Sequence, residues 1–251
     1  MRRTSLRCLL SPAAHGARSP SRGGVAACMV LAALLAAPPA AAQIEFQWSG
    51  NSSSSINWSD PFNWYFLTPP VCTQGVAIVT FSSPAGSYDT YADVNCNPYQ
   101  LRILGTAGYT FYGSELWINQ ALYAESFANQ VVHNSLHFPN AGGVGGNPRE
   151  IENSLDARLT LTGSIETPGA LEVFTVGPVT LSGQVYGSGY IAKSGDGTLL
   201  LSGNNSYSGG TLILQGTLAT GASNVIPPGT VELQGGPSIS RVTRRRSGRA
   251  P

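Results

Sequence analysis

The chain has 251 residues, of which 30 are glycine and 17 are proline, and only 11% are charged. So little charge excludes a coiled coil and a disordered acidic tail, and glycine without a three-residue period excludes a collagen. Ten of the 14 basic residues lie before residue 23 or after residue 240. The body between these limits has four cations and 13 acids, a net charge of about −9 with neutral histidines. A nucleic-acid-binding surface is therefore not expected.

The first 42 residues have the pattern of a secretory signal peptide. A basic stretch that extends to Arg22 precedes the apolar run 25–37, and small residues follow as far as Ala42. The apolar run is shorter than the roughly 20 residues that a membrane span needs. We therefore expect cleavage between Ala42 and Gln43, and no transmembrane segment in the mature chain.

Cleavage would leave two cysteines, Cys72 and Cys96, in an exported protein. Neither lies in a CxxC motif or near a histidine in the sequence, so their spacing argues against a zinc site. An oxidising compartment favours a disulfide between them, and their separation in the sequence is close to the length of one repeat of the chain. The alternative is a pair of buried free thiols.

Short segments of alternating apolar and polar residues recur with a period of about 20 residues, which is typical of a repeat architecture. Three of them align without gaps from Leu159, Val179 and Leu199, and each ends at a glycine. The three glycines, Gly163, Gly183 and Gly203, are evenly spaced. Two looser copies begin at Leu212 and Val231. Alternation of this kind predicts strands whose first and third residues share one face.

This period predicts an all-β fold, a right-handed parallel β-helix, with a β-sandwich as the alternative. In a β-helix, each turn places its strand beside the equivalent strand of the turn before. Leu161, Leu181 and Leu201 would then stack about 4.8 Å apart along the core. We expect Leu159, Val179 and Leu199 to point inward beside them.

The segment 187–218 combines this alternation with many glycine, threonine and leucine positions. Its pattern is carried by Gly189, Lys193, Gly195, Gly197, Thr198, Leu199, Leu201, Gly203, Asn205, Tyr207, Gly209, Gly210, Thr211, Gly216, Thr217 and Leu218. The segment closely resembles the autotransporter-associated β-strand repeat, also called the passenger-associated transport repeat. The resemblance implies a β-helical passenger over residues 43–240, secreted or displayed at the surface of a Gram-negative-type bacterium.

Two pairs of acids are candidate catalytic residues for an enzyme. They are considered because polysaccharide-cleaving enzymes also use parallel β-helices. A hydrolase needs two carboxylates in one cleft. Asp89 and Asp93 would share a face if extended, and so would Glu150 and Glu152. We interpret both pairs as solvated loop acids. A lyase would also need a basic residue near them, and the body of the chain has only four cations.

Metal and cofactor motifs are weak throughout the chain. His133 and His137 share a face by strand spacing but have no third ligand, so we interpret them as structural or exposed. The turn 193–198 is similar to a calcium-binding glycine–aspartate turn, but one aspartate supplies too few oxygen ligands. Residues 142–146 form a glycine-rich loop without the strand and helix of a nucleotide site. We predict no catalytic residue, metal or cofactor.

Aromatic residues gather near the mature N-terminus, and arginines gather at the other end. We expect these aromatic side chains to cap the first turn of the β-helix, with a ligand platform as the alternative; they are Trp48, Trp58, Trp64 and Tyr65.

At the other end, apolar alternation stops at Ile239. Residues 241–251 are expected to be a disordered arginine-rich tail outside the fold.

These features together predict an exported, non-enzymatic surface scaffold, with adhesion as a candidate role. The partner would be an unidentified surface ligand, with a glycan or a host surface as candidates. The alternative function is that of a carbohydrate-active β-helix enzyme, either a polysaccharide hydrolase or a lyase.

Overall fold

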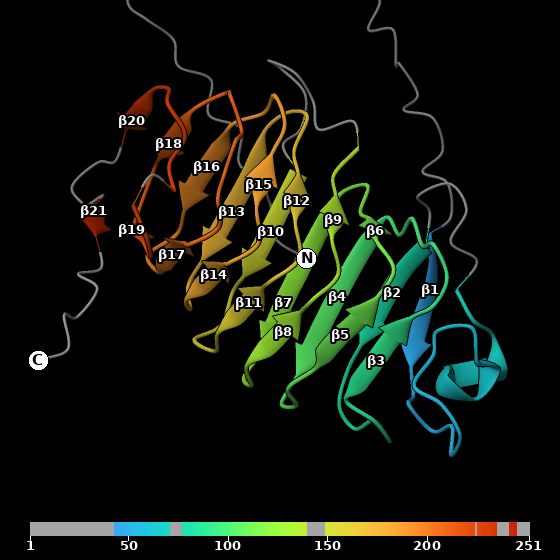
Figure 1. The fold of residues 1–251 in the computed structure, drawn as a ribbon. Helices are drawn as coiled ribbons and strands as arrows, with labels where there is room; N and C mark the ends of the chain where they lie inside the picture. The colour runs from blue at the N-terminus through green and yellow to red at the C-terminus, as the bar shows by residue number, and fades with distance from the viewer. Residues whose placement is uncertain (1–42, 71–76, 140–148, 224, 235–240, 245–251) are drawn as a thin grey trace, which may run out of the picture. The chain divides into compact units, whose positions relative to one another are not determined.

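The computed structural model describes residues 43–70, 77–139, 149–223, 225–234 and 241–244. Nearly all regular structure in these ranges is β-strand, and the strands pair in parallel within three sheets (Figure 1). The chain passes from one sheet to the next and then returns to pair with its own previous turn, here called a rung. The predicted parallel β-helix is confirmed, and the β-sandwich is excluded because its sheets would be antiparallel.

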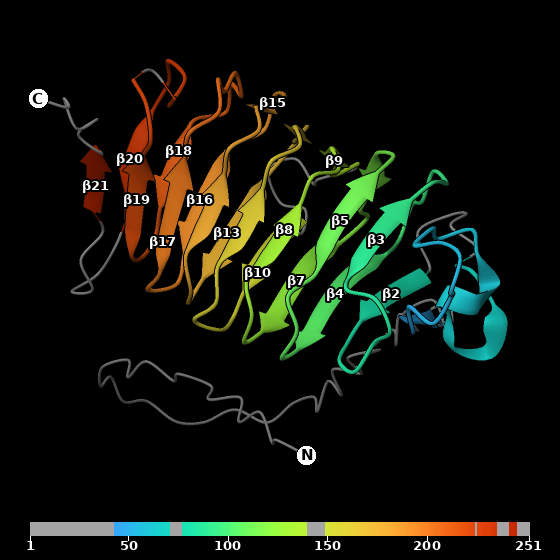
Figure 2. The ribbon, with the colours of Figure 1, turned by 60° about the horizontal axis from the view of Figure 1, so that its bottom comes forward.

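The three sheets are named A, B and C in the order in which the chain meets them within a rung. Sheet A contains β1 (Ile44–Trp48), β2 (Ala77–Phe81), β4 (Gln100–Gly105), β7 (Ala121–Ser126), β10 (Arg149–Asn153), β13 (Leu171–Thr175), β16 (Ile191–Ser194), β18 (Thr211–Ile213) and β20 (Val231–Leu233). Sheet B contains β3 (Asp89–Ala92), β5 (Thr110–Gly113), β8 (Gln130–Val132), β11 (Leu159–Leu161), β14 (Val179–Leu181), β17 (Thr198–Leu201), β19 (Thr217–Thr220) and β21 (Arg241–Arg244). Sheet C contains β6 (Leu116–Trp117), β9 (Leu136–His137), β12 (Ile165–Glu166) and β15 (Val185–Tyr186). Figure 2 shows the strands of one sheet following one another along the solenoid, for example β16, β18 and β20 of sheet A.

The leucine stack predicted for the core is confirmed in sheet B. Leu161, Leu181 and Leu201 are register partners on successive rungs, and all three are buried. The row of Leu159, Val179 and Leu199 is paired and buried in the same way. Residues between the two rows, such as Thr160 and Thr180, are only half-buried. The alternation places apolar side chains inside and leaves hydroxyl-bearing ones on the outer face.

The even spacing of the glycines has a steric cause at the corner after sheet B. A Cβ added to Gly183 would lie 1.9 Å from the carbonyl oxygen of Gly163, and one added to Gly203 would lie 2.0 Å from that of Gly183. Both distances are far below van der Waals contact. Only glycine lets the backbone of one rung approach the backbone of the previous rung this closely.

The two looser copies of the repeat, which begin at Leu212 and Val231, do not belong to sheet B with the other three copies. β18 and β20 belong to sheet A, where Thr211 pairs with Val231 and Ile213 with Leu233. The inward residue is therefore Ile213, which is fully buried, and Leu212 faces outward and is only half-buried. A shift of one residue reverses every face of a strand, so the alignment of Leu212 with Val231 was wrong.

The expected tail also differs from the structure at its beginning. Residues 241–244 form β21, which pairs in parallel with β19, and Thr217 is the register partner of Arg241. Strand pairing uses backbone groups that every residue carries except the proline nitrogen, so basic side chains do not prevent it. Residues 245–251 and the predicted signal peptide lie outside the described residues. Within the described ranges, no helix has the length and hydropathy needed to cross a membrane.

Candidate functional site

Lys193, a residue of the predicted repeat, lies in the interior of the fold. It is the register partner of Val173 and Ile213, which are both buried, and its own side chain is completely buried. Its ammonium group donates hydrogen bonds to the carbonyl oxygens of Ser194 (2.7 Å), Gly195 (2.7 Å) and Gln215 (3.0 Å). Lys193 thus holds the corner of its own rung against the next rung.

Among the described residues, no carboxylate lies within ion-pair distance of Lys193. Burial lowers the pKa of Lys193 to about 8, and the negative charge of Asp196 partly opposes this shift. Asp196 instead accepts a hydrogen bond from the side-chain amide of Gln215 at 2.6 Å. The turn 193–198, considered above as a calcium loop, is therefore bonded to its neighbouring rung through both Lys193 and Asp196.

Asn205 and Tyr207 provide the same kind of connection at another corner. The buried amide of Asn205 accepts a hydrogen bond from the backbone nitrogen of Val185 (2.8 Å) and donates one to the carbonyl oxygen of Val225 (2.7 Å). It therefore joins the rung before it to the rung after it. The ring of Tyr207 is buried, and its hydroxyl lies 2.7 Å from that of Thr211.

The glycines of the repeat are positions where neighbouring rungs touch. Added Cβ atoms at Gly189, Gly195 and Gly209 would all come within 2.6 Å of a backbone atom on the preceding rung. Gly216 has a φ of +75°, and its added Cβ would also lie 2.9 Å from the Lys193 nitrogen. With the buried Leu199, Leu201 and Leu218, these residues build the stacking of rungs.

A ladder of acids runs across the outer face of sheet A. Glu150 is the register partner of Glu172 on the next rung, and Glu152 lies two residues along β10 on the same face. Tyr123 pairs with Glu152, and its hydroxyl is 3.5 Å from the carboxylate of Glu150. Glu150 and Glu152 are half-buried strand residues, so their interpretation as solvated loop acids was wrong.

These carboxylates raise one another's affinity for protons. Burial raises the pKa of Glu150 and the charge of Glu172 raises it further, while the hydrogen bond from Tyr123 lowers it. Burial also raises the pKa of Glu152, with further contributions from Glu150 and Glu125. Sequence spacing missed Glu172 and Glu125, because they join the cluster from other rungs. Their place becomes evident only when the register of sheet A is known.

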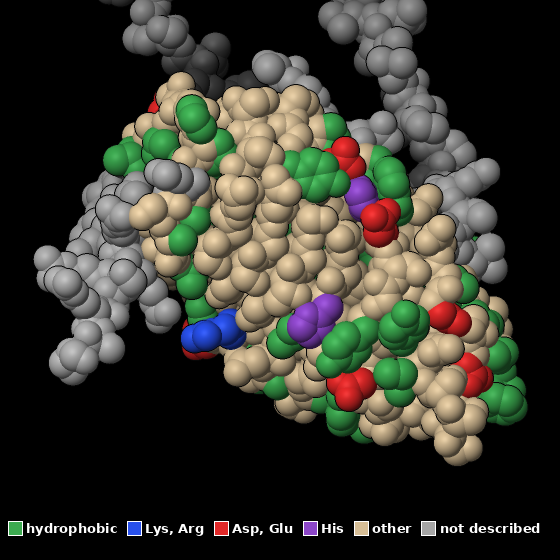
Figure 3. Space-filling model, in the orientation of Figure 1, with side chains coloured by type: hydrophobic (Ala, Val, Ile, Leu, Met, Phe, Trp, Pro, Cys, Tyr) green, Lys and Arg blue, Asp and Glu red, His purple; other side chains and the backbone are tan. Residues whose placement is uncertain are grey.

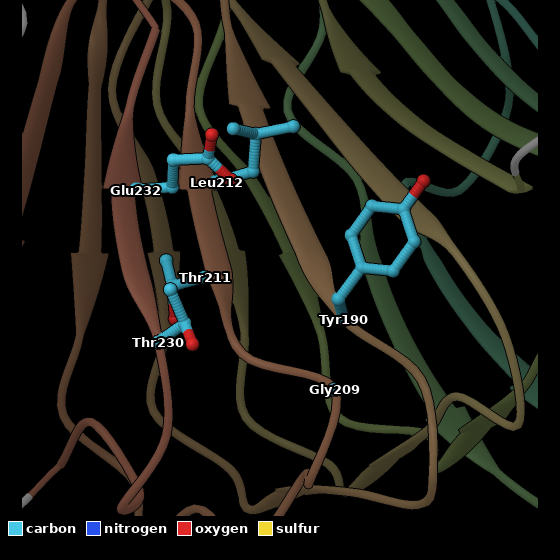
Figure 4. Close-up of a pocket in the computed structure, with 6 residues that line it drawn as sticks. All are labelled: Tyr190, Gly209, Thr211, Leu212, Thr230 and Glu232. Atoms are coloured by element: carbon cyan, nitrogen blue, oxygen red, sulfur yellow. The ribbon is translucent and has the colours of Figure 1, made fainter.

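Surface hollows lie on the outer faces of sheets A and B. One, of about 200 Å³, lies over the start of β16, β18 and β20, and among its described lining residues Glu232 is the only charged one (Figure 4). Tyr190 forms one side of it, and Leu212 and Glu232 lie together on the other. The second hollow, of about 310 Å³, lies on sheet B, and the part of its lining that the structure describes holds Arg158 with threonine, leucine and proline side chains but no acid. The described residues thus do not combine an acid with a cation in either hollow.

His133 and His137 do not lie on one strand, so the prediction of a shared face was wrong. His133 follows β8, stacks on Tyr112 with ring centroids 4.9 Å apart, and places Nδ1 2.7 Å from the Thr162 hydroxyl. His137 belongs to β9 of sheet C, beyond the corner formed by residues 134–135. Figure 3 shows histidine side chains at two separate places on one face of the molecule.

His137 is held between two carboxylates from different rungs. Its Nδ1 lies 2.6 Å from Glu166 and its Nε2 lies 3.2 Å from Glu115. The imidazole also stacks on Trp117, with centroids 4.4 Å apart. No group of three or more His, Cys, Asp or Glu residues within the described part of the chain is arranged to hold a metal ion.

The tryptophans near the mature N-terminus are buried, as a cap requires. Trp48, Trp58 and Trp64 are at most 1% exposed, and they surround Phe81 with centroid distances of 5.2–6.0 Å within the cluster. Trp64 packs edge-to-face on the other three rings, whereas Trp48 and Trp58 are tilted against Phe81. All three indole nitrogens donate hydrogen bonds, two of them to Ser87 and Thr90 of the following rung. They are closed to a ligand, whereas Tyr65 is 42% exposed.

The remaining predicted residues have separate positions. Asp89 is exposed at the start of β3, and Asp93 accepts hydrogen bonds from the backbone nitrogen and the hydroxyl of Ser59. Cys96 is buried and disulfide-bonded. Cys72, Ala42 and the loop 142–146 lie outside the described residues, so the Cys72–Cys96 pairing and the cleavage at Gln43 stay predictions.

Comparison with known proteins agrees with the geometry of the repeat. The family model of the passenger-associated-transport-repeat matches residues 191–219, which contain Lys193, Asn205 and Tyr207. The chain is therefore a β-solenoid that carries a passenger-associated transport repeat. No solved structure matches the chain.

One curated relative matches a short segment of the chain. A segment of 55 residues is 47% identical to the adhesin BmaC autotransporter of Brucella suis biovar 1 (strain 1330). The match covers 22% of this chain and 2% of that much longer adhesin. Over this segment, the chain is similar to a part of an autotransporter adhesin.

Proposed function

We propose that the chain is an exported, non-enzymatic β-helical passenger, which displays a scaffold with an adhesive role at the surface of a Gram-negative-type bacterium. The observation that carries this proposal is the use of the repeat residues. Lys193, Asn205 and the repeat glycines all contact neighbouring rungs. The repeat thus serves to extend a rigid solenoid, and its similarity to a segment of an adhesin supports a place at the cell surface.

Export is tested with the full chain expressed in a Gram-negative host. We expect a mature protein that begins at Gln43, and digestion of this protein when protease is added to intact cells. A cytoplasmic marker in the same cells should stay intact. Retention of residues 1–42 on a protein confined to the cytoplasm would contradict the proposal.

Adhesion is tested with beads that carry the purified chain and a cultured epithelial monolayer as the probe. Beads with the folded chain should attach, and beads with the heat-unfolded chain should not, because adhesion by a scaffold depends on its folded faces. Equal attachment of both kinds of bead would remove the adhesive role.

The acid ladder of sheet A favours a second candidate, a carbohydrate-active enzyme. A general acid at neutral pH needs a raised pKa, and the pKa values of Glu150 and Glu152 are raised on an open sheet face. Neighbouring rungs are about 4.8 Å apart, which is near the carboxyl separation of retaining glycosidases, about 5–5.5 Å.

Reducing-sugar release separates the two candidates. The probes are a soluble neutral β-glucan and a polyuronate, incubated with the wild type, Glu150→Gln and the control Glu45→Gln. Under the leading proposal, none of the three proteins releases sugar above background. Release by the wild type and the control that is lost in Glu150→Gln would establish the enzyme instead.

A further inference from the structure

Four large apolar side chains are exposed together on the cap between β1 and β2. We call Phe62, Tyr65, Phe66 and Leu67 the aromatic tip; they lie in or beside the short 3₁₀ helices η1 (Pro61–Asn63) and η2 (Tyr65–Leu67). Their exposed fractions are 63%, 42%, 97% and 59%. Soluble proteins seldom expose so many large apolar side chains within one short segment without a partner for them.

The tip is mounted on a rigid support. Asn63 is fully buried, and its side-chain amide donates to the carbonyl oxygens of Ser55 (3.0 Å) and Asn57 (3.1 Å). The adjacent Trp64 is also buried and donates its indole hydrogen to the carbonyl oxygen of Trp58 at 2.8 Å. Buried anchors within the segment therefore fix the direction in which the tip projects.

The backbone of the tip is held in a conformation that large side chains disfavour. Phe66 has a φ of 65° and Leu67 has a φ of 54°, both in the left-handed region. Glycine or asparagine would adopt this region more easily. Strained positions that expose apolar side chains instead of burying them indicate a use for those side chains outside the fold.

No charged side chain interrupts the tip. Residues 61–70 contain no acid or base. The nearest acid in sequence, Asp60, accepts hydrogen bonds from Ser52 and Ser55 at 2.6 Å each, and from the backbone nitrogen of Phe62 at 3.0 Å. Its carboxylate is thus engaged at the base of the tip. A partner would meet an uncharged apolar surface.

Size and shape decide between a protein partner and a lipid partner. At about 200 Å² for each large side chain, the exposed fractions give the tip roughly 500 Å² of accessible surface. A stable protein interface uses about 800 Å² on each partner. The tip is smaller than this and projects outward, and Phe66 is open on nearly every side. A fluid layer of acyl chains can surround such a side chain completely.

We propose that the aromatic tip inserts into the interfacial region of a lipid bilayer, and that it does so without a requirement for anionic headgroups. Phe66 and Leu67 enter the acyl-chain boundary, and Tyr65 stays at the headgroup level, where its ring and hydroxyl meet both environments. This activity is independent of the proposed export and adhesion, because it depends only on the cap of the folded chain.

Flotation with phosphatidylcholine vesicles tests the insertion. The full chain should float with the vesicles, and Phe66→Gly should lower its partition coefficient by about tenfold or more, the effect expected from removing one large buried side chain. Glycine suits the positive φ at this position, so the variant keeps the fold, which the fluorescence of the buried tryptophans checks. Phe127→Ser is the matched control, since Phe127 is 74% exposed between β7 and β8.

Each result of this experiment decides the proposal. Binding that is unchanged in high salt, lost in Phe66→Gly and kept in Phe127→Ser supports insertion of the tip. A wild-type chain that stays with the soluble fraction overturns it, as would be seen if the tip fits a protein pocket instead. Equal loss in the two variants, or binding that appears only with anionic vesicles, also overturns it.

Discussion

Replacing Lys193 with methionine should change how the stability of the solenoid depends on pH. Burial lowers the pKa of Lys193 to about 8 from an ordinary value of 10.5. Between these two values, the unfolded chain binds a proton that the folded chain does not bind, so the free energy of unfolding rises with pH. The stability associated with the neutral amine is fully present above about pH 10.5, and it is lost as the pH falls through about 8.

The difference of about 2.5 pKa units corresponds to about 3 kcal/mol across this window. Lys193→Met has a side chain of similar length without a titrating group, so it should lack the rise. It should also be less stable than the wild type at pH 7, because the carbonyl oxygens of Ser194, Gly195 and Gln215 lose their donor. Burial also raises the pKa of Tyr109, which lowers stability above about pH 10 in both proteins.

The assay is denaturant unfolding of the wild type and the variant, followed by tryptophan fluorescence. It is repeated at about pH 7, 8, 9 and 10, which cover most of the range between the folded and unfolded pKa values of Lys193. The difference in stability between the two proteins should grow as the pH rises. Parallel curves for the two proteins over this range would show that Lys193 keeps an ordinary affinity for its proton. The account of its burial would then fail.

Three further predictions concern the core, the rung connections and the disulfide. Leu181→Ala should lower the free energy of unfolding by about 2–5 kcal/mol, because Leu181 is fully buried in a stacked row; a loss below about 0.5 kcal/mol in denaturant unfolding would contradict its inward position. Asn205→Ala should lower the free energy of unfolding by about 2–4 kcal/mol, because it leaves two buried backbone groups unpaired. The control Asn204→Ala, at an exposed neighbouring position, should change the melting temperature little. Equal effects of the two substitutions would refute the bridging role of Asn205. Thiol titration of the exported, denatured chain should find no free thiol from Cys72 or Cys96, and two reactive groups would reject their disulfide.

Sheet B could be predicted from the sequence because its signal is local. The alternation around Leu161, Leu181 and Leu201 marks the inward face, and a glycine follows each strand at a constant distance. The glycines have a single cause, the close approach of rungs, which repeats identically at each corner. Each of these positions reflects one local constraint, so the strand and its inward face can be predicted from the sequence without knowledge of the fold.

Sheet A could not be predicted equally well, because its register and its acids depend on other rungs. A one-residue shift reversed the faces of β18, where Ile213 and not Leu212 is inside. Glu150 and Glu172 lie on different rungs, far apart in the sequence, and become neighbours only through strand pairing. Lys193 is another such case, because a lysine in an alternating strand is ordinarily expected on the solvent side.

β21 shows a different limit of sequence patterns. Its basic residues break the apolar alternation, yet its backbone continues sheet B beside β19. The backbone groups of β19 need partners whatever side chains the partner strand carries. A change in composition therefore marks the end of the apolar core better than it marks the end of strand pairing.

The contact between corner glycines sets the unit by which such a protein can change its length. Gly183 meets the backbone of Gly163, and Gly203 meets the backbone of Gly183. Duplication or loss of one complete rung therefore restores these backbone contacts at the junction, because the same backbone surface is presented again. Insertion of a single residue at a corner instead disturbs two rungs at once. A change in length by whole rungs therefore keeps the backbone contacts between corners, whereas a change by single residues does not.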